Sequence, residues 1–125
     1  MSTIALSGKS FSETVSRDGI VMVDFWAAWC GPCRAFAPVF EAAATEHPDI
    51  VFAKVDTEAE PALSRSLGIM SIPTLMIFRD GILVFEQPGA QPAAVLARLI
   101  DAVRDLDMDA VRQEMTAPGA VAETA

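Results

Sequence analysis

A long apolar run that leads into a closely spaced cysteine pair limits the fold more than any other feature of the sequence. Residues 20–26 (IVMVDFW) are apolar except for Asp24, which is typical of a central strand covered on both faces. From residue 32 to residue 46 the apolar side chains recur at spacings of three and four, which predicts a helix with Pro32 in its first turn. Cys30 and Cys33, the only cysteines of the chain, therefore lie where a buried strand passes into a helix.

The rest of the chain alternates between strand-like and helix-like segments. We expect strands at 3–6, 51–55, 74–78 and 82–85, the last two joined by a hairpin turn at Asp80-Gly81. We expect helices after a capping residue at Ser7, at 61–67, and from about 91 to 106, with a continuation or a new helix from Asp107. The order βαβαβαββα predicts the α/β class, with a mixed central β-sheet flanked by helices on both faces. One domain, 1–107, is then followed by a C-terminal extension, 108–125, which is helical at first and disordered beyond Thr116.

The composition argues against several classes of protein. With 125 residues, 52% of them apolar, the chain is long enough for one domain with a core and too short for two. The net charge of −8 and nine scattered Lys and Arg residues argue against a nucleic-acid-binding protein. The first ten residues do not resemble a secretory signal, and no apolar run is long enough to span a bilayer. We therefore expect a cytoplasmic protein that does not bind membranes, in a compartment where a disulfide is usually transient and catalytic.

The positions of the two cysteines suit reversible thiol–disulfide chemistry. The unpaired N–H groups and partial positive charge at a helix N-terminus favour the thiolate of Cys30. Cys33 lies one turn later on the same side, close enough to bond with Cys30 but inside the helix, where we expect solvent to reach it poorly while Cys30 stays exposed. Cys30 would attack a substrate disulfide, and Cys33 would then resolve the mixed disulfide and release the reduced substrate.

Three simpler interpretations of the cysteine pair are weaker. A structural crosslink that closes so short a loop would remove only about 2 kcal/mol of unfolded-state entropy, against about 5 kcal/mol for a long loop. A metal site would need more ligands, but the chain has no second cysteine pair, and its one histidine, His47, stands before a proline. Two inert buried thiols at this spacing, at the start of a helix, would be a coincidence. We therefore expect a redox-active pair and no metal.

Several further segments match one known family in order and spacing. They are Phe25-Trp-Ala-Ala-Trp-Cys-Gly-Pro-Cys-Arg34, Pro38, Lys54-Val-Asp56, Gly68-Ile69, Ser71-Ile-Pro-Thr74, Asp80-Gly81 and Pro88-Gly89. Over roughly 6–106 the chain resembles the thioredoxins. The resemblance implies the thioredoxin fold and a general protein-disulfide reductase that is re-reduced by an NADPH-dependent thioredoxin reductase. It also implies a monomer with no bound cofactor and no metal.

The resemblance also implies roles for residues around the cysteines. Cys30 is the attacking cysteine and Cys33 the resolving one, while Asp24 takes or returns the proton of Cys33. Burial in an apolar strand should raise the pKa of Asp24 toward the range of a general base, with Lys54 on the next strand as its charge partner. Alternatively, Asp24 and Lys54 form a structural ion pair, or Asp24 faces water at the end of the strand. Pro73 matches the family's cis-proline beside the disulfide, although from sequence alone a trans proline that opens the strand is the simpler interpretation.

The family's substrate surface corresponds to a flat apolar area around Cys30, here called the substrate patch. Its members would be Trp29, Gly31, Pro32, Ile72 and Gly89. The backbone of Ile72 would bind an extended substrate segment, whereas a turn before the last helix is an equally good interpretation of Gly89. The chain departs from the family at Met70, where a basic residue is more usual, and at Pro88, where an aliphatic residue is more usual. Both changes bear on the choice of partner.

Two other functions fit parts of this pattern. An oxidase or isomerase of the same fold usually has a histidine between its cysteines, which raises the redox potential, whereas this chain has Gly31-Pro32. A redox-independent interaction subunit would use the substrate patch to hold a partner. Changing Cys33 to Ser separates the interaction subunit from an enzyme, because only an enzyme would lose turnover.

Overall fold

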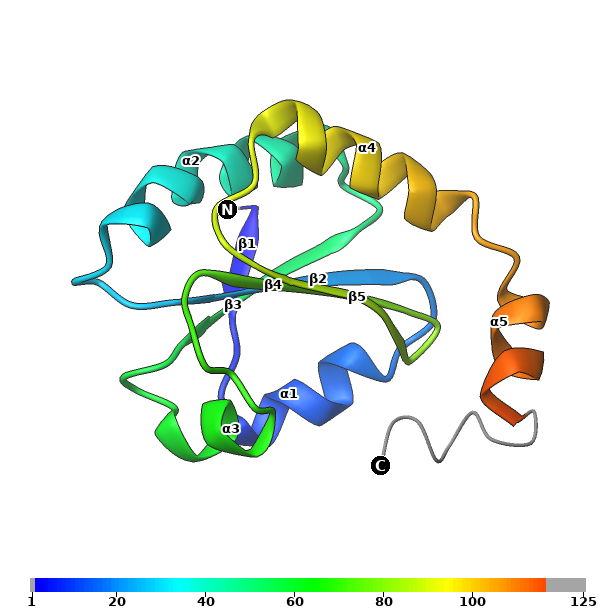
Figure 1. Ribbon diagram of the computed structural model, residues 1–125, viewed down its shortest axis with the longest axis horizontal. Coiled ribbons are helices and arrows are strands. Elements are labelled where there is room, and N and C mark those ends of the chain that lie inside the picture. The colour runs from blue at the N-terminus through cyan, green and yellow to red at the C-terminus, as the bar shows by residue number, and fades with distance from the viewer. Residues whose placement is uncertain (1, 117–125) are drawn as a thin grey trace.

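The computed structural model describes residues 2–116, which form a five-stranded sheet with helices on both faces (Figure 1). The elements follow in the order β1 (Thr3–Ala5), α1 (Gly8–Val15), β2 (Ile20–Trp26), α2 (Gly31–Glu46), β3 (Val51–Asp56), α3 (Pro61–Ser66), β4 (Thr74–Arg79), β5 (Ile82–Pro88), α4 (Ala93–Arg104) and α5 (Met108–Thr116). The predicted order βαβαβαββα and the mixed sheet are confirmed, with α5 following as a further helix. None of the helices in this described range is both long and apolar enough to cross a membrane.

The strand that leads to the cysteines lies in the middle of the sheet. The strand order is β1-β3-β2-β4-β5, and β2 runs parallel to β3 and antiparallel to β4. The register places Asp24 between Lys54 of β3 and Leu75 of β4. Because strands flank both of its edges and helices cover both of its faces, β2 is apolar along nearly its whole length. It is therefore a rigid base for the segment that follows.

Two separate cores hold the helices against the sheet. Helices α2 and α4 cover one face, and α1 and α3 cover the other (Figure 1). Side chains alternate along a strand, so Met22 packs with the α2 residues Phe36 and Phe40, whereas Val23 packs on the opposite face. Asp24 lies two residues after Met22. Its carboxyl group therefore points to the face that α2 covers.

Local sequence signals set several of the element boundaries. Ser7 caps α1 as predicted: its hydroxyl accepts a hydrogen bond from the Ser10 N–H, and the Ser10 hydroxyl accepts one from the Ser7 N–H. Asp80 and Gly81 both have positive φ angles, 54° and 83°, which suit the tight turn of the β4–β5 hairpin. These boundaries were predictable because each depends on neighbouring residues alone.

The structure extends the prediction at two places. Strand β5 continues to Pro88 instead of ending at 85, because Pro88 still pairs with Thr74 of β4. As an edge strand, β5 tolerates a residue without an N–H. Helix α5 is a new helix rather than a continuation of α4, and the N–H groups of Asp109 and Ala110 donate to Oδ1 of Asp107 at its start. The predicted disordered end, 117–125, lies outside the described residues.

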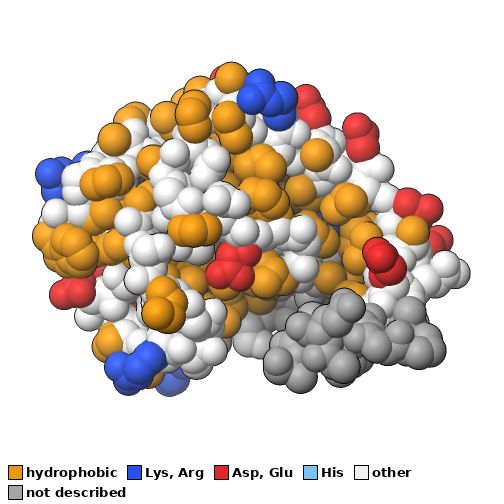
Figure 2. Space-filling view, viewed as in Figure 1, with side chains coloured by type: hydrophobic (Ala, Val, Ile, Leu, Met, Phe, Trp, Pro, Cys, Tyr) orange, Lys and Arg blue, Asp and Glu red, His pale blue; other side chains and the backbone are white. Residues whose placement is uncertain are grey.

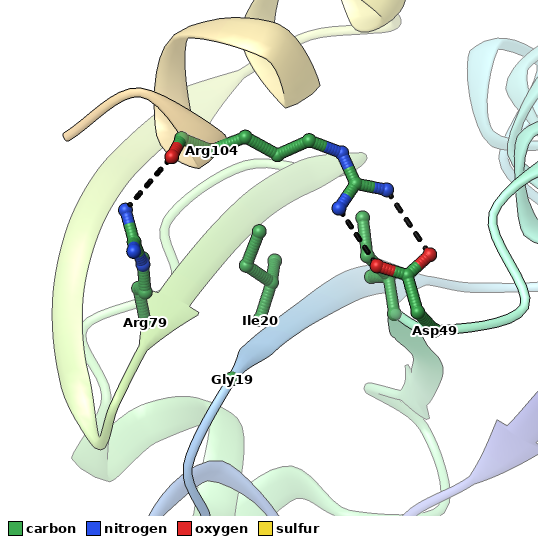
Figure 3. A pocket seen from close by; sticks show the side chains of 6 residues that line it. Gly19, Ile20, Asp49, Arg79 and Arg104 are labelled. Atoms are coloured by element: carbon green, nitrogen blue, oxygen red, sulfur yellow. Dashed lines mark hydrogen bonds and ion pairs between the residues drawn. The ribbon is translucent and has the colours of Figure 1, made fainter.

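Arg79 on β4 binds the end of α4. Its Nη1 donates to the carbonyl oxygens of Val103, Arg104 and Leu106 at 2.8, 3.2 and 2.8 Å. Of these carbonyls, that of Val103 also accepts from the Leu106 N–H at 3.3 Å, and the guanidinium adds a donor to all three where α4 ends. Arg104 in turn binds both carboxyl oxygens of Asp49, at 2.7 and 3.1 Å, in a pocket that both arginines line (Figure 3). This pocket lies at the start of β2, at the opposite end of the sheet from the cysteines.

Candidate active site

Cys30 and Cys33 are joined by a disulfide where β2 passes into α2. Cys30 has an extended backbone and caps α2, and Cys33 lies in the first turn of that helix. Their Cα atoms are 5.2 Å apart, within the ordinary range for a disulfide. The prediction that this spacing lets the two sulfur atoms bond is confirmed.

The start of α2 provides a favourable environment for negative charge on Cys30. The backbone N–H of Cys33 donates a hydrogen bond to Sγ of Cys30 at 3.2 Å. The N-terminus of this 16-residue helix adds a partial positive charge at the same place. When the disulfide is reduced, both effects favour the thiolate of Cys30 over the thiol.

The expected difference in exposure between the two cysteines is wrong for the oxidised protein. Cys30 is 4% exposed and Cys33 is 2% exposed, so both are buried. They pack with Ala27, and the half-buried side chains of Trp26 and Ile72 cover this cluster. The coverage of Cys30 comes from a segment far away in the sequence, which helical position alone does not indicate.

Asp24 is fully buried within β2, the strand that leads to the cysteines, and neither of its carboxyl oxygens has a hydrogen-bond partner among the described residues. Burial raises the pKa of Asp24 from 3.8 to about 7, and the charge of Lys54 lowers it by a smaller amount. The alternative that Asp24 faces water is therefore wrong. A carboxyl group with a pKa near neutrality can both accept and return a proton under ordinary conditions.

Lys54 lies opposite Asp24 in the register of β2 and β3 but forms no ion pair with it. The Nζ atom of Lys54 instead lies 5.0 Å from the centre of the Trp26 ring. Lys54 is thus a charge partner of Asp24 as expected, but it acts through space without an ion pair, and its ammonium group makes a cation–π contact with Trp26. The alternative of a satisfied structural ion pair is wrong as well.

The loop before β4 meets the disulfide from the other side. The Ile72–Pro73 peptide bond is cis, and Pro73 is buried. The carbonyl oxygen of Ile72 lies 3.7 Å from Sγ of Cys30. Gly89 has a φ of +103°, and its N–H donates to the carbonyl oxygen of Pro73 at 2.7 Å, which ties the end of β5 to this loop. The fold therefore brings Ile72 to the cysteines and ties Gly89 to Pro73, the residue after Ile72.

Of the five residues predicted for the substrate patch, Ile72 packs against the cysteines, whereas Trp29, Gly31 and Pro32 adjoin Cys30 in the chain and Gly89 bonds to Pro73. Trp29 is 67% exposed, Gly31, Pro32 and Gly89 are exposed, and Ile72 is half-buried. Figure 2 shows hydrophobic side chains gathered at the end of the molecule where Figure 1 places the loop between β2 and α2. Met70, two residues before Ile72, is almost fully exposed and extends the apolar surface.

One residue of this region was missed from the sequence. Nη1 of Arg34 donates a hydrogen bond to the carbonyl oxygen of Ala28 at 2.9 Å, across the loop that carries Cys30. The only available signal was a basic residue directly after Cys33. A side chain that reaches back six residues leaves no periodic pattern in a sequence.

The residue considered as a metal ligand lies elsewhere. His47 caps the C-terminal end of α2, at the opposite end of that helix from the cysteines, and its Nδ1 lies 3.2 Å from Nη2 of Arg104. Within residues 2–116, no three His, Cys, Asp or Glu side chains gather in a way that could hold a metal ion.

Comparison with known proteins agrees with this geometry. The family model for thioredoxin matches residues 2–102. A putative thioredoxin 2 of Streptomyces coelicolor is 54% identical over 112 residues, which cover 90% of this chain and 84% of that protein. A thioredoxin of Alicyclobacillus acidocaldarius is 43% identical over 104 residues, covering 82% of this chain and 99% of its own. A solved thioredoxin variant from Halobacterium salinarum has a TM-score of 0.76 and 34% identity, covering 84% of this chain and 94% of the other.

The sequence match, the shared architecture and the disulfide between two residues three positions apart lead to one assignment. The match includes β1 to β5 and nearly all of α4, and therefore every element that positions the cysteines. The fold is the thioredoxin fold. The chain belongs to the thioredoxin family, whose members are oxidoreductases that catalyse thiol–disulfide exchange and need no bound cofactor.

Proposed function

We propose that this chain is a general protein-disulfide reductase that passes two electrons from a Cys30/Cys33 dithiol to disulfides in other proteins. The observation that carries the proposal is the position of Sγ of Cys30. It accepts a hydrogen bond from the N–H of Cys33 at the start of α2, is bonded to the sulfur of Cys33, and borders an exposed apolar surface. This combination supports a nucleophilic sulfur with a resolving partner at hand.

The reaction takes place in two exchanges. The thiolate of Cys30 attacks one sulfur of the substrate disulfide, and an S–S bond forms between them while the other substrate sulfur leaves as a thiolate. The thiolate of Cys33 then attacks Sγ of Cys30, which forms the Cys30–Cys33 disulfide and releases the second substrate thiolate. The substrate gains two electrons and two protons, and the cysteine pair loses them.

Asp24 serves the second exchange by accepting the proton of the Cys33 thiol. Its carboxyl group is buried on the face of β2 that α2 covers, and its pKa of about 7 makes both protonation states accessible near neutral pH. Lys54 keeps the pKa of Asp24 from rising further. Asp24 is thus the general base; burial sets most of its strength, and Lys54 moderates it.

The substrate patch recognises an extended segment of the substrate protein. Trp29, Gly31 and Pro32 border Cys30 in the chain, while the carbonyl oxygen of Ile72 lies beside its sulfur. The hydrogen bond from the Gly89 N–H to the carbonyl oxygen of Pro73 holds the loop. Backbone pairing with Ile72 depends little on the side chains of the substrate, which supports broad specificity.

The oxidised enzyme must be reduced again before another turnover. Thioredoxins act with a thioredoxin reductase, and we assign this chain an NADPH-dependent one, so NADPH serves indirectly and is not bound here. The enzyme works as a monomer in the cytoplasm, where the surroundings keep thiols reduced. Residues 1–107 are the catalytic domain, and 108–125 are an extension of it.

The two rival functions have less support. A redox-independent interaction subunit gives no reason for a cysteine pair placed at a helix N-terminus, whereas exchange chemistry requires it. An oxidase or isomerase has no support from the residues between the cysteines, because Gly31 and Pro32 offer no side-chain charge to stabilise a thiolate. The family relation favours the reductase over both.

The direct test is reduction of insulin disulfides with NADPH and a thioredoxin reductase, in which the loss of NADPH absorbance at 340 nm measures turnover. We expect turnover with the wild-type chain, and less than about one hundredth of that rate with Cys33→Ser, because the mixed disulfide cannot be resolved. A well-folded wild-type protein without turnover would exclude the enzymatic proposal.

Trapping separates an enzyme from a binding protein in the same experiment. Cys33→Ser should accumulate a covalent conjugate with the substrate through Cys30, seen on a gel without reductant and lost when reductant is added. The matched control Cys30→Ser should give neither turnover nor conjugate. A conjugate with Cys30→Ser would show that Cys33, and not Cys30, attacks the substrate disulfide.

A further inference from the structure

Arg34 reaches back from α2 across the loop that carries Cys30. Its backbone N–H donates to the carbonyl oxygen of Cys30 at 3.1 Å, which closes the first turn of the helix. Its Nη1 donates to the carbonyl oxygen of Ala28 at 2.9 Å. On the way the side chain passes Gly31, where a Cβ atom would lie 4.0 Å from Nη2. One residue thus connects both sides of Cys30.

The loop that Arg34 holds has few other constraints. Residues 27–29 lie beyond the end of β2, and a backbone hydrogen bond from Cys30 to the carbonyl oxygen of Ala27, at 3.2 Å, closes the turn. Within residues 2–116, no side chain other than that of Arg34 bonds to the backbone of this loop. Trp29, the next residue after Ala28, is mostly exposed. Ala27 and Cys30 are buried at the two ends of the loop, and Arg34 makes the side-chain hydrogen bond to its exposed middle, next to Trp29.

The position of this arginine does not favour the helix itself. A positive charge in the first turn opposes the partial positive charge of a helix N-terminus. Among the described residues, Arg34 has no ion pair with a carboxylate that would offset this effect. The contact that the side chain does make is directed at the loop, and an arginine is well suited to it because its planar guanidinium offers several N–H donors.

We propose that Arg34 is a positioning residue for substrate recognition, an inference that rests on the proposed reductase function. Its hydrogen bond to Ala28 holds the Ala27–Cys30 loop so that Trp29 presents its face beside Sγ of Cys30. Arg34 touches neither the substrate disulfide nor the reacting sulfur atoms. It acts through the loop, and its loss weakens binding of protein substrates rather than the chemistry of the thiolate.

The test compares Arg34→Met with Arg34→Lys in steady-state reduction of insulin. Arg34→Met should raise KM about three- to tenfold with kcat little changed, because an exposed hydrogen bond from a charged donor contributes modestly. The pH profile of Cys30 alkylation by iodoacetamide should stay at the wild-type position in both variants, since this small probe does not need Trp29. Arg34→Lys keeps the charge on a shorter side chain with one donor group, so its KM should lie between wild type and Arg34→Met.

Arg17→Met is the matched control. Arg17 is an exposed arginine in the turn before β2, at the other end of that strand from Cys30, and the variant removes the same charge. Equal KM values for Arg34→Met and Arg17→Met would overturn the inference. A shift of the alkylation pH profile in Arg34→Met would also overturn the inference if Arg34→Lys restored both the profile and KM. The charge of Arg34, and not its hydrogen bond to Ala28, would then be the cause. If wild type and Arg17→Met both reduce insulin, either result leaves the proposed function intact; if neither does, the proposed function itself fails.

Discussion

At the scale of single side chains, Asp24 keeps its proton to a much higher pH than an exposed aspartate does. Its side chain is fully buried, and among the described residues nothing hydrogen-bonds to its carboxyl oxygens. Burial raises the pKa from 3.8 to about 7 in the folded protein. Between these pH values the folded protein binds a proton that the unfolded chain has released. The free energy of unfolding therefore falls as the pH rises through this window and levels off above it.

Asp24→Asn removes the ionisable carboxyl group and should therefore remove the fall in unfolding free energy that this group causes as the pH rises. A pKa raised from 3.8 to about 7 corresponds to about 4 kcal/mol of unfolding free energy. The variant should differ little from wild type at about pH 4, and its advantage in unfolding free energy should grow with pH toward that limit. Urea unfolding of the oxidised proteins at about pH 4, 6 and 8 measures the difference.

The control for this prediction is Asp18→Asn, which removes one negative charge from an exposed turn. It separates the effect of net charge from the effect of a buried carboxyl group. If the difference in unfolding free energy between Asp24→Asn and wild type stays constant from pH 4 to 8, folding does not raise the pKa of Asp24.

At the scale of elements, the prediction succeeded where the physical cause is local. Strand β2 was found from its continuous apolar run, and the start of α1 was found from Ser7, whose hydroxyl caps the helix. The hairpin was found from Asp80 and Gly81, which adopt positive φ angles. Each of these signals depends on residues within a few positions of one another, so the sequence alone contains them.

The parts that were missed depend on contacts between distant segments. The length of β5 is set by pairing of Pro88 with Thr74, and the burial of Cys30 is set by Ile72. The pairing of Lys54 with Asp24 was correct in register, but the ammonium group turns toward Trp26 instead. Register follows from strand order, whereas the direction of a long side chain depends on which neighbour lies within reach.

Arg79 is the element-scale contact with the clearest consequence for stability. It is half-buried and donates three hydrogen bonds to carbonyl oxygens at and just beyond the end of α4. Arg79→Met removes the guanidinium donor from all three carbonyls, leaves Val103 with backbone donors alone, and should lower the free energy of unfolding by about 1–3 kcal/mol. Arg98→Met, an exposed arginine on α4, is the control and should change it by less than about 0.5 kcal/mol. Urea unfolding measures the free energy of unfolding of both variants. Equal losses in Arg79→Met and Arg98→Met would mean that water replaces the lost guanidinium donor.

At the scale of the whole molecule, the candidate site and the C-terminal helix lie at opposite ends. The loop between β2 and α2 forms one end, and α5 lies at the other (Figure 1). Helix α5 nevertheless packs on the domain, because Met108 is buried and Arg112 pairs with Asp80 at 3.5 Å. Farther along the helix, a groove lined by Leu83 lies between α5 and β5. The family match ends at residue 102, before this helix begins. Position and packing together suggest that α5 contributes to stability and not to catalysis.

Removing the extension tests this division and the boundary at 107. A chain that ends at Asp107 keeps every residue of the candidate site and loses α5, so we expect insulin reduction at the wild-type rate. It also loses the buried side chain of Met108, which should lower the free energy of unfolding by about 2 kcal/mol. Met108→Ala in the full chain is the matched control, and it should reproduce most of that loss because it removes the same apolar contact. Activity and urea unfolding are measured on both proteins at the same concentration. A folded 1–107 chain with reduced turnover would place the extension within the catalytic unit, because none of the removed residues that the structure describes, 108–116, touches the cysteines.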